Sequence, residues 1–195
     1  MRYQPPMANP KSELVPATPA DLPVLQTMAT YYVYDISEYC GDEPGWQFPE
    51  TGLYDCEPFA PYFEDPAAHP YLIRVAGELA GFAIVDAKGS TPDIQFNMAQ
   101  FWVHRKFKGR GVGADAVGQL FARYAGLWEV NVIPANRGAF AFWRRVIHRH
   151  AVGPVIEGRR PAPHLRGQLK DLFRFRTATP LPQGEGGARR GAMGG

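Results

Sequence analysis

The segment from Phe101 to Ala114 constrains the fold more than any other part of the chain. It reads FWVHRKFKGRGVGA, so an apolar, strand-like stretch runs directly into three glycines at alternate positions. The apolar residues of the next segment recur at the spacing of one helix face: Val117, Leu120, Phe121 and Tyr124. A glycine loop that opens a helix presents unpartnered backbone N–H groups and the positive end of the helix dipole. This arrangement favours binding of an anion, normally a phosphate.

Several phosphate-binding motifs have glycine-rich loops, and two of them do not fit. A P-loop needs GxxxxGK[ST], which the chain lacks. A dinucleotide-binding fingerprint needs GxGxxG, whereas Gly109, Gly111 and Gly113 alternate, and the acidic residue expected downstream, Glu129, lies inside a strand-like run. A turn that binds nothing is a further alternative, and Lys108 and Arg110 beside the glycines argue against it.

Periodicity and turn residues predict alternating strands and helices around this loop. We expect strands at 13–17, 71–75, 79–85, 94–103, 128–132 and 172–177. Asp21 is the expected N-cap of the first helix rather than Thr18, because Pro23 cannot lie deeper than the first turn, and Asn136 caps the last helix. The stretch 41–70 is rich in Gly, Pro, Asp and Glu, with a short helix expected near 53–63. The pattern indicates a mixed sheet with helices, of the α/β or α+β class.

Length and composition limit the organisation of the chain and its class of partner. The 195 residues, 45% of them hydrophobic, suit one domain at 13–177, with a loose leader at 1–12 and a disordered Gly/Pro-rich tail at 178–195. A net charge of +2 argues against nucleic-acid binding, and no apolar run suits a membrane span or a signal peptide. Cys40 and Cys56 lack CxxC spacing and the histidines lack metal-ligand spacing. We therefore expect a cytoplasmic protein with two reduced thiols and no metal.

Several segments in order resemble the GNAT superfamily of acyl-CoA-dependent N-acyltransferases. The string 108–113, KGRGVG, is similar to the family motif [Q/R]xxGx[G/A], with Lys108 where Arg or Gln is usual. The runs 99–104 and 128–132 resemble the family's fourth and fifth strands, and the hairpin 71–85 its second and third. The sequence from Asn136 to Trp143 resembles an NxxAxxFY helix start. The resemblance covers roughly residues 13–177 and implies a mostly antiparallel sheet of six to seven strands, with flanking helices and splayed fourth and fifth strands.

The resemblance implies an N-acetyltransferase with acetyl-CoA as co-substrate. In the family the glycine loop holds the pyrophosphate, and the pantetheine arm adds to the backbone of the fourth strand. Direct attack by a primary amine in a ternary complex would then transfer the acetyl group. The implied cofactor-binding residues are Phe101, Trp102, Val103, Lys108, Gly109, Arg110, Gly111, Val112, Gly113, Ala114, Asn136 and Trp143.

The expected catalytic residues depart from the family pattern at two positions. Gln100 stands where many members carry Glu or Asp, and it cannot act as a base; Trp143 stands where Tyr is common, and its indole N–H donates but is a poor acid. Asp35 and Glu38 follow the first helix and are candidates to bind the amine or accept its proton, with Tyr34 beside them. The alternatives are solvated loop carboxylates for this pair and simple core packing for Trp143.

Two other functions remain open, as does the acceptor. Gln100 and Trp143 also suit a catalytically degraded acyl-CoA-binding or sensing domain, and an unrelated α/β protein would show no CoA affinity. The acidic and aromatic stretch 31–63 favours a small amine with an apolar body, whereas Arg159 and Arg160 in 152–164 favour a carboxylate on the acceptor. An amino acid or a peptide N-terminus satisfies both. The sequence leaves a homodimer open.

Overall fold

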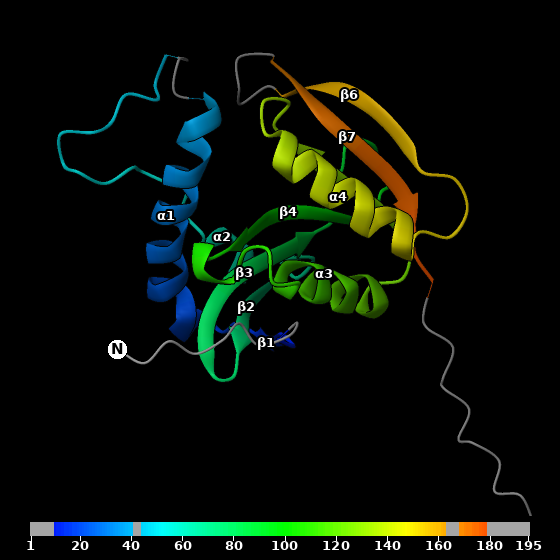
Figure 1. Cartoon of the computed structure of the whole chain (residues 1–195), viewed down its shortest axis with the longest axis horizontal. Helices are drawn as coiled ribbons and strands as arrows, with labels where there is room; N and C mark the ends of the chain where they lie inside the picture. The colour runs from blue at the N-terminus through cyan, green and yellow to red at the C-terminus, as the bar shows by residue number, and fades with distance from the viewer. Residues whose placement is uncertain (1–9, 41–43, 163–167, 179–195) are drawn as a thin grey trace, which may run out of the picture.

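The described residues form a single mixed sheet with helices on both faces (Figure 1). The computed structural model describes residues 10–40, 44–162 and 168–178, and within these the seven strands follow the order β1-β2-β3-β4-β5-β7-β6. Neighbouring strands are antiparallel except β4 and β5, which run parallel. The strands are β1 (Glu13–Pro16), β2 (His69–Val75), β3 (Glu78–Asp86), β4 (Phe96–Val103), β5 (Leu127–Val132), β6 (Ile156–Ala162) and β7 (Gln168–Arg176). The predicted fold class is confirmed.

Two apolar cores fill the opposite faces of the sheet. The helices α3 (Val112–Arg123) and α4 (Arg137–His150) cover one face, and α1 (Leu22–Cys40) with the short α2 (Pro61–Glu64) covers the other. The central strand β3 contributes to both cores, because successive side chains point to opposite faces. Ala83 and Val85 pack towards α3 and α4, whereas Phe82 and Ile84 pack towards α1.

The first helix begins where the prolines allow it to begin. Pro19–Asp21 forms a 3₁₀ turn whose N-cap is Thr18, and the α-helix starts at Leu22, directly after Asp21. Pro23 is therefore the second helical residue, where its missing N–H costs no hydrogen bond. The Asp21 carboxylate accepts hydrogen bonds from the backbone N–H and the hydroxyl of Thr18, both at 2.8 Å. Asp21 thus precedes the α-helix as expected, and Thr18 caps only the 3₁₀ turn.

The first helix is longer than the sequence pattern predicted. It continues to Cys40, so Tyr34, Asp35 and Glu38 lie on its last turns rather than in a following loop. The apolar stripe fades after Tyr32, but the segment 33–40 contains neither Gly nor Pro to end the helix. The expectation of loop carboxylates is therefore wrong, and the helix holds Asp35 and Glu38 one turn apart.

Two other element predictions also differ from the structure. The helix expected near 53–63 is restricted to Pro61–Glu64, because Pro58 and Pro61 disfavour a helix in the residues before them. No strand was predicted at Ile156–Ala162, yet β6 pairs there with β7 at the sheet edge. Gly158, Pro161 and three charged residues break the apolar alternation, as an exposed edge strand permits.

A bulge in β4 opens the sheet between its two central strands. Ile84 of β3 pairs with Gln100 and Val85 pairs with Met98, so Ala99 is an extra residue that bends β4. Beyond the bulge β4 leaves β5, since the two strands pair only through Phe96–Trp128 and Asn97–Glu129. The predicted splay of the fourth and fifth strands is confirmed, and it separates the later half of β4 from β5.

The expected leader at 1–12 and tail at 178–195 lie mostly outside the described residues, and so do 41–43 and 163–167. The domain limits 13–177 stay a prediction. At the described N-terminal boundary, the backbone N–H and hydroxyl of Ser12 both donate to Asp115 of α3 at 2.7 Å. None of the described helices is both long and apolar enough to cross a membrane. The cytoplasmic location also stays a prediction.

Candidate functional site

The glycine loop ends in a helix N-terminus that no side chain caps. After β4, a 3₁₀ turn at Arg105–Phe107 leads to Gly109 and Gly111, with φ of 77° and 80°. These left-handed values favour glycine, and Gly111 as the N-cap of α3 offers no side chain to the first N–H groups. The first turn of α3 therefore presents backbone donors and the positive end of its dipole to the solvent side of the loop.

The third glycine allows close packing of α3 against its neighbours. A Cβ at Gly113 would lie 3.4 Å from the Phe142 ring of α4 and 3.5 Å from Val103 of β4. The helix start is thus held between β4 and α4, and a larger side chain at 113 would push them apart. The loop prediction made from the sequence is consistent with this local geometry.

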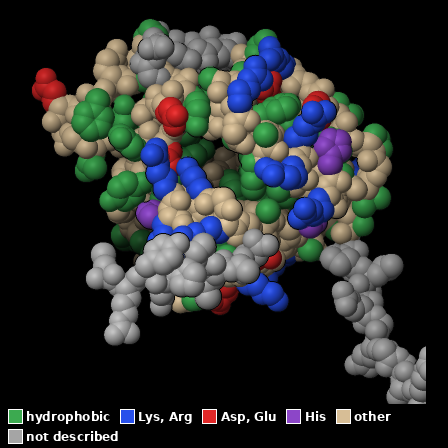
Figure 2. Space-filling model, in the orientation of Figure 1, with side chains coloured by type: hydrophobic (Ala, Val, Ile, Leu, Met, Phe, Trp, Pro, Cys, Tyr) green, Lys and Arg blue, Asp and Glu red, His purple; other side chains and the backbone are tan. Residues whose placement is uncertain are grey.

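A cleft of about 760 Å³ opens at this helix start, in the gap left by the splayed strands. Its wall is made by the later half of α1, the end of β4, the glycine loop and α4 from Gly138 to Arg149. Figure 2 shows the hollow near the centre of this face, with Lys and Arg side chains around it. Its basic lining residues among the described ones are Arg105, Lys108, Arg145 and Arg149, and the acidic ones are Asp35 and Glu38. The cleft therefore suits an anionic ligand.

The later half of β4 turns backbone groups towards the cleft. His104 N–H donates to Ala80 of β3 at 2.8 Å, which sets the alternation of bonded pairs in this antiparallel ladder. By that alternation the backbone N–H and C=O of Trp102 hydrogen-bond to β3. The N–H and C=O of Phe101 and Val103 point to the other edge of β4, from which β5 has diverged. An extended ligand with amide groups can add to this edge as a strand does.

The far wall of the cleft comes from α4 and the residue that caps it. Asn136 caps this helix as predicted, because its Oδ1 accepts the Ala139 N–H at 2.8 Å. Phe142 stacks on Phe101 with ring centroids 5.9 Å apart, and Trp143 meets Phe101 edge-on at 5.2 Å. Trp143 is only 6% exposed, so it packs in the core and lines the cleft at the same time.

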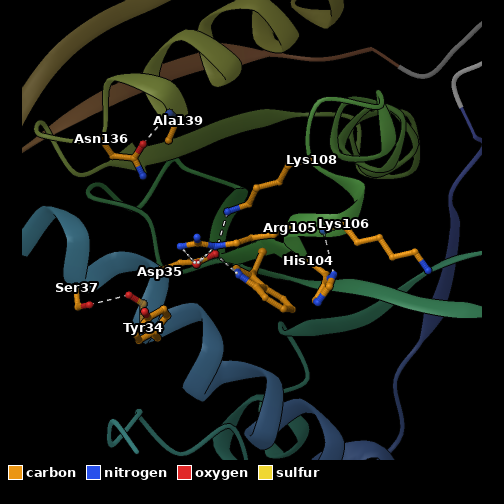
Figure 3. A network of polar contacts seen from close by, with 10 residues as sticks. Tyr34, Asp35, Ser37, His104, Arg105, Lys106, Lys108, Asn136 and Ala139 are labelled. Atoms are coloured by element: carbon orange, nitrogen blue, oxygen red, sulfur yellow. Dashed lines mark hydrogen bonds and ion pairs between the residues drawn. The ribbon is translucent and has the colours of Figure 1, made fainter. Parts of the chain in front are cut away.

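Asp35 is the most heavily engaged residue of the cleft (Figure 3). One carboxylate oxygen accepts Arg105 Nε at 2.8 Å, and the other accepts Lys108 Nζ at 2.9 Å and Trp102 Nε1 at 3.0 Å. Burial raises the pKa of this carboxyl, but the hydrogen bonds from Lys108, Trp102 and Arg105 outweigh it and hold the pKa below its usual range. A carboxylate with this environment is a poor proton acceptor at neutral pH.

The other residues predicted for the acceptor site, Tyr34 and Glu38, lie in two places. Glu38 and Tyr39 line the cleft together with Tyr32, whose burial raises its phenol pKa to about 12. Tyr34 does not line the cleft; it borders a smaller outer groove of about 260 Å³ with Tyr31 and His104. Of the predicted acceptor residues, Asp35 and Glu38 therefore meet in the cleft and Tyr34 lies outside it.

Three other predicted residues do not line the cleft. Gln100 is on the sheet face that α1 and α2 cover, where its amide nitrogen lies 3.4 Å from the hydroxyl of Tyr62, and it is not among the residues that line the cleft. Arg110 is exposed and is not among the residues that line the cleft, and the Val112 side chain is fully buried in the core. Both still contribute backbone to the loop, which is where the predicted phosphate contacts lie.

Sequence reasoning missed a polar cluster on the face of the sheet that carries Gln100. Glu129 of β5 is fully buried and lies 2.9 Å from Arg160 and 3.5 Å from Arg174. Ser90, in the loop after β3, donates to the same carboxylate through its backbone N–H and its hydroxyl. A charged residue between the apolar Trp128 and Val130 was the available signal, because an inward-facing carboxylate in a strand needs buried partners.

Comparisons with known proteins agree with this geometry. The family model described as "Acetyltransferase (GNAT) family" matches residues 33–147, more than half of the chain. A search of curated proteins finds no matching sequence. An acetyltransferase from Thermus thermophilus has a similar structure, with a TM-score of 0.60 and 17% identity over 87% of this chain and 99% of that one.

Two further similar structures carry names that describe their substrates. A ribosomal-protein-alanine N-acetyltransferase from Brucella melitensis gives a TM-score of 0.56 and 18% identity over 85% of this chain and 99% of that one. The aminoglycoside acetyltransferase AAC(6')-Ib, solved with coenzyme A, gives a TM-score of 0.56 and 16% identity over 85% of this chain and 95% of that one. At these identities the structures show a shared fold, and together with the family match they establish that this chain belongs to the GNAT family of acetyltransferases.

Proposed function

We propose that this protein transfers an acetyl group from acetyl-CoA to a primary amine of a small-molecule or peptide acceptor. The observation that carries the proposal is the uncapped start of α3, which opens behind a glycine loop into a cationic cleft beside the unpaired edge of β4. Acetyl-CoA would supply the acetyl group as a thioester: an N–C bond forms, the S–C bond breaks, and one proton moves from the amine to the leaving sulfur.

The residues of the cleft fit this co-substrate in three places. The N–H groups of 109–114 suit the pyrophosphate, and Lys108 is a loop cation that lines the cleft. The backbone of Phe101 and Val103 suits the amides of the pantetheine arm. Phe142 and Trp143 close the apolar side of the cleft and exclude water from the region beside Phe101.

The acceptor amine has to lose a proton before it can attack. An alkylammonium of pKa about 10.4 costs about 4–5 kcal/mol to deprotonate at pH 7. Asp35 is held as an ion by its three donors, and Gln100 lies outside the cleft and has no basic group. We assign Glu38 to bind the ammonium and to pass its proton to water, because it is the cleft carboxylate that makes no ion pair among the described residues.

Trp143 is the proposed donor to the leaving sulfur. Its indole N–H can hydrogen-bond a thiolate but does not transfer a proton usefully, so water completes the protonation. The phenol of Tyr32 also lines the cleft, and a pKa of about 12 makes it a weak acid at neutral pH. Catalysis here thus relies more on positioning than on a strong acid and base.

The test is calorimetric titration with acetyl-CoA, CoA and NAD, followed by an amine screen that detects thiol release. We expect micromolar binding of both CoA species, no binding of NAD, and turnover with at least one primary amine. Binding without turnover of any amine would favour an acyl-CoA-binding domain instead, and absence of CoA binding would overturn the proposal.

A matched pair of variants locates the binding at the glycine loop. Ala114 lies in the first turn of α3 and lines the cleft. Ala114→Glu places a negative charge at the proposed phosphate position. An acidic residue in the first turn stabilises a helix, so this substitution should not unfold α3. We expect Ala114→Glu to raise the Kd for CoA at least about tenfold above that of Ala114→Gln, which has the same bulk without the charge. Equal affinities would place the phosphates elsewhere.

A further inference from the structure

Asp35 makes an anion-binding arrangement with the residues that flank the glycine loop. Its carboxylate accepts two cationic side chains and one indole N–H, which are the kinds of donor that bind a phosphate. The Asp35 side chain is 14% exposed, whereas those of Arg105 and Lys108 are 64% and 52% exposed. The two cations are thus largely exposed, whereas the carboxylate that they contact on α1 is mostly buried.

The two cations differ in their distance along the chain from the glycines. Lys108 immediately precedes Gly109, whereas Arg105 belongs to the 3₁₀ turn after β4. Figure 3 shows both side chains reaching Asp35 from the loop side, and the Trp102 indole N–H donates to the same carboxylate. If the phosphates bind at 109–114, Lys108 is the cation that a phosphate and Asp35 must share.

We propose that Asp35 competes with the phosphates of the co-substrate for Lys108 and so weakens their binding. This inference rests on the proposed function. Binding of a diphosphate would move Lys108 from Asp35 towards the loop, while Arg105 and Trp102 remain on the carboxylate. Asp35 is then a positioning residue, which lowers the affinity for the co-substrate and lets the product CoA dissociate.

The decisive variant is Asp35→Asn, which keeps the shape and an acceptor for the Trp102 N–H but removes the charge. We expect its Kd for CoA and for acetyl-CoA to fall about tenfold, by the same factor for both, because the phosphates are common to the two molecules. In steady state the KM for acetyl-CoA should fall without a rise in kcat. A role limited to anchoring α1 would instead raise Kd and lower the thermal midpoint.

The chain offers a matched control in Glu78→Gln. Glu78 pairs with Lys106 Nζ at 2.6 Å, so it also neutralises a cation of the segment 105–108, but neither residue lines the cleft. We expect no gain in CoA affinity from Glu78→Gln. An equal gain would show a general charge effect and overturn the proposal.

A double-mutant cycle tests whether Lys108 carries the effect. In a Lys108→Gln background, Asp35→Asn should change the Kd for CoA by less than about twofold. Asp35→Ser, a smaller neutral side chain, repeats the measurement should Asp35→Asn unfold. Unchanged or weaker binding by folded Asp35 variants would overturn this inference while leaving the proposed function intact, whereas a wild-type protein that does not bind CoA would overturn the proposed function.

Discussion

At the residue scale, two carboxylates three positions apart on α1 have different surroundings. The sequence placed Asp35 and Glu38 near the acceptor region, but it did not reveal that Asp35 would be surrounded by donors from positions 102 to 108. That contact joins segments about seventy residues apart, and no local pattern encodes it. The glycine loop was predictable because its glycines, strand and helix are consecutive in the chain.

Trp143 allows the role of a proton or hydrogen-bond donor to be separated from packing. Trp143→Tyr and Trp143→Phe remove similar volume beside Phe101 and Phe142, and they differ by one hydroxyl. We expect kcat of the Tyr variant to exceed that of the Phe variant about tenfold, because a phenol can donate to the leaving sulfur. Stopped thiol-release assays give kcat, and urea unfolding gives the stability of each variant. Equal kcat values would mean that a phenol at position 143 does not assist the leaving sulfur.

At the element scale, predictions succeeded where local signals were strong and failed where tertiary contacts decide. Asn136 was identified as an N-cap because its side chain bonds within its own helix turn. The edge strand β6 escaped detection because its hydrogen bonds to β7, rather than any apolar alternation, make it a strand. The extension of α1 to Cys40 was also missed, since its last turns carry the polar residues of the cleft.

The packing of α4 on α3 predicts a pH dependence of stability. A Cβ at Gly118 of α3 would lie 3.0 Å from the His150 ring, which also meets Phe121 edge-on. Burial, and then the charge of Arg149, lowers the pKa of His150 below its ordinary value of 6.5. The folded state therefore binds fewer protons than the unfolded state just below pH 6.5, so the contribution of His150 to stability is lost as pH falls through that range.

The comparison of wild type with His150→Gln isolates this group from the other histidines. We expect the free energy of unfolding of wild type to fall between pH 7.5 and pH 5.5 by more than that of the variant, as measured by urea unfolding at each pH. His148 and its contact with Glu157 are present in both proteins, so they do not contribute to the difference. Parallel pH profiles would contradict the assignment to His150.

At the scale of the whole molecule, the splay that forms the cleft leaves the two halves of the sheet weakly joined. Only two residue pairs connect β4 to β5, so other contacts must hold β5, β7 and β6 in place. The Glu129 carboxylate supplies such contacts, because it binds Ser90 of the loop after β3, Arg160 of β6 and Arg174 of β7. The same buried network explains why a charged residue interrupts an otherwise apolar strand.

Removal of this charge should destabilise the protein without altering the cleft. Glu129→Gln leaves Arg160 and Arg174, each about a quarter exposed, without their shared carboxylate. We expect the free energy of unfolding to fall by about 3 kcal/mol, at the low end for a broken buried pair because the arginines are partly hydrated. Glu157→Gln, which breaks the more exposed pair with Arg144, should cost less than about 1 kcal/mol.

Because Glu129 does not line the cleft, the Kd for CoA of the folded Glu129→Gln variant should match wild type. A loss of CoA affinity without a loss of stability would mean that the network acts on the site rather than on the sheet.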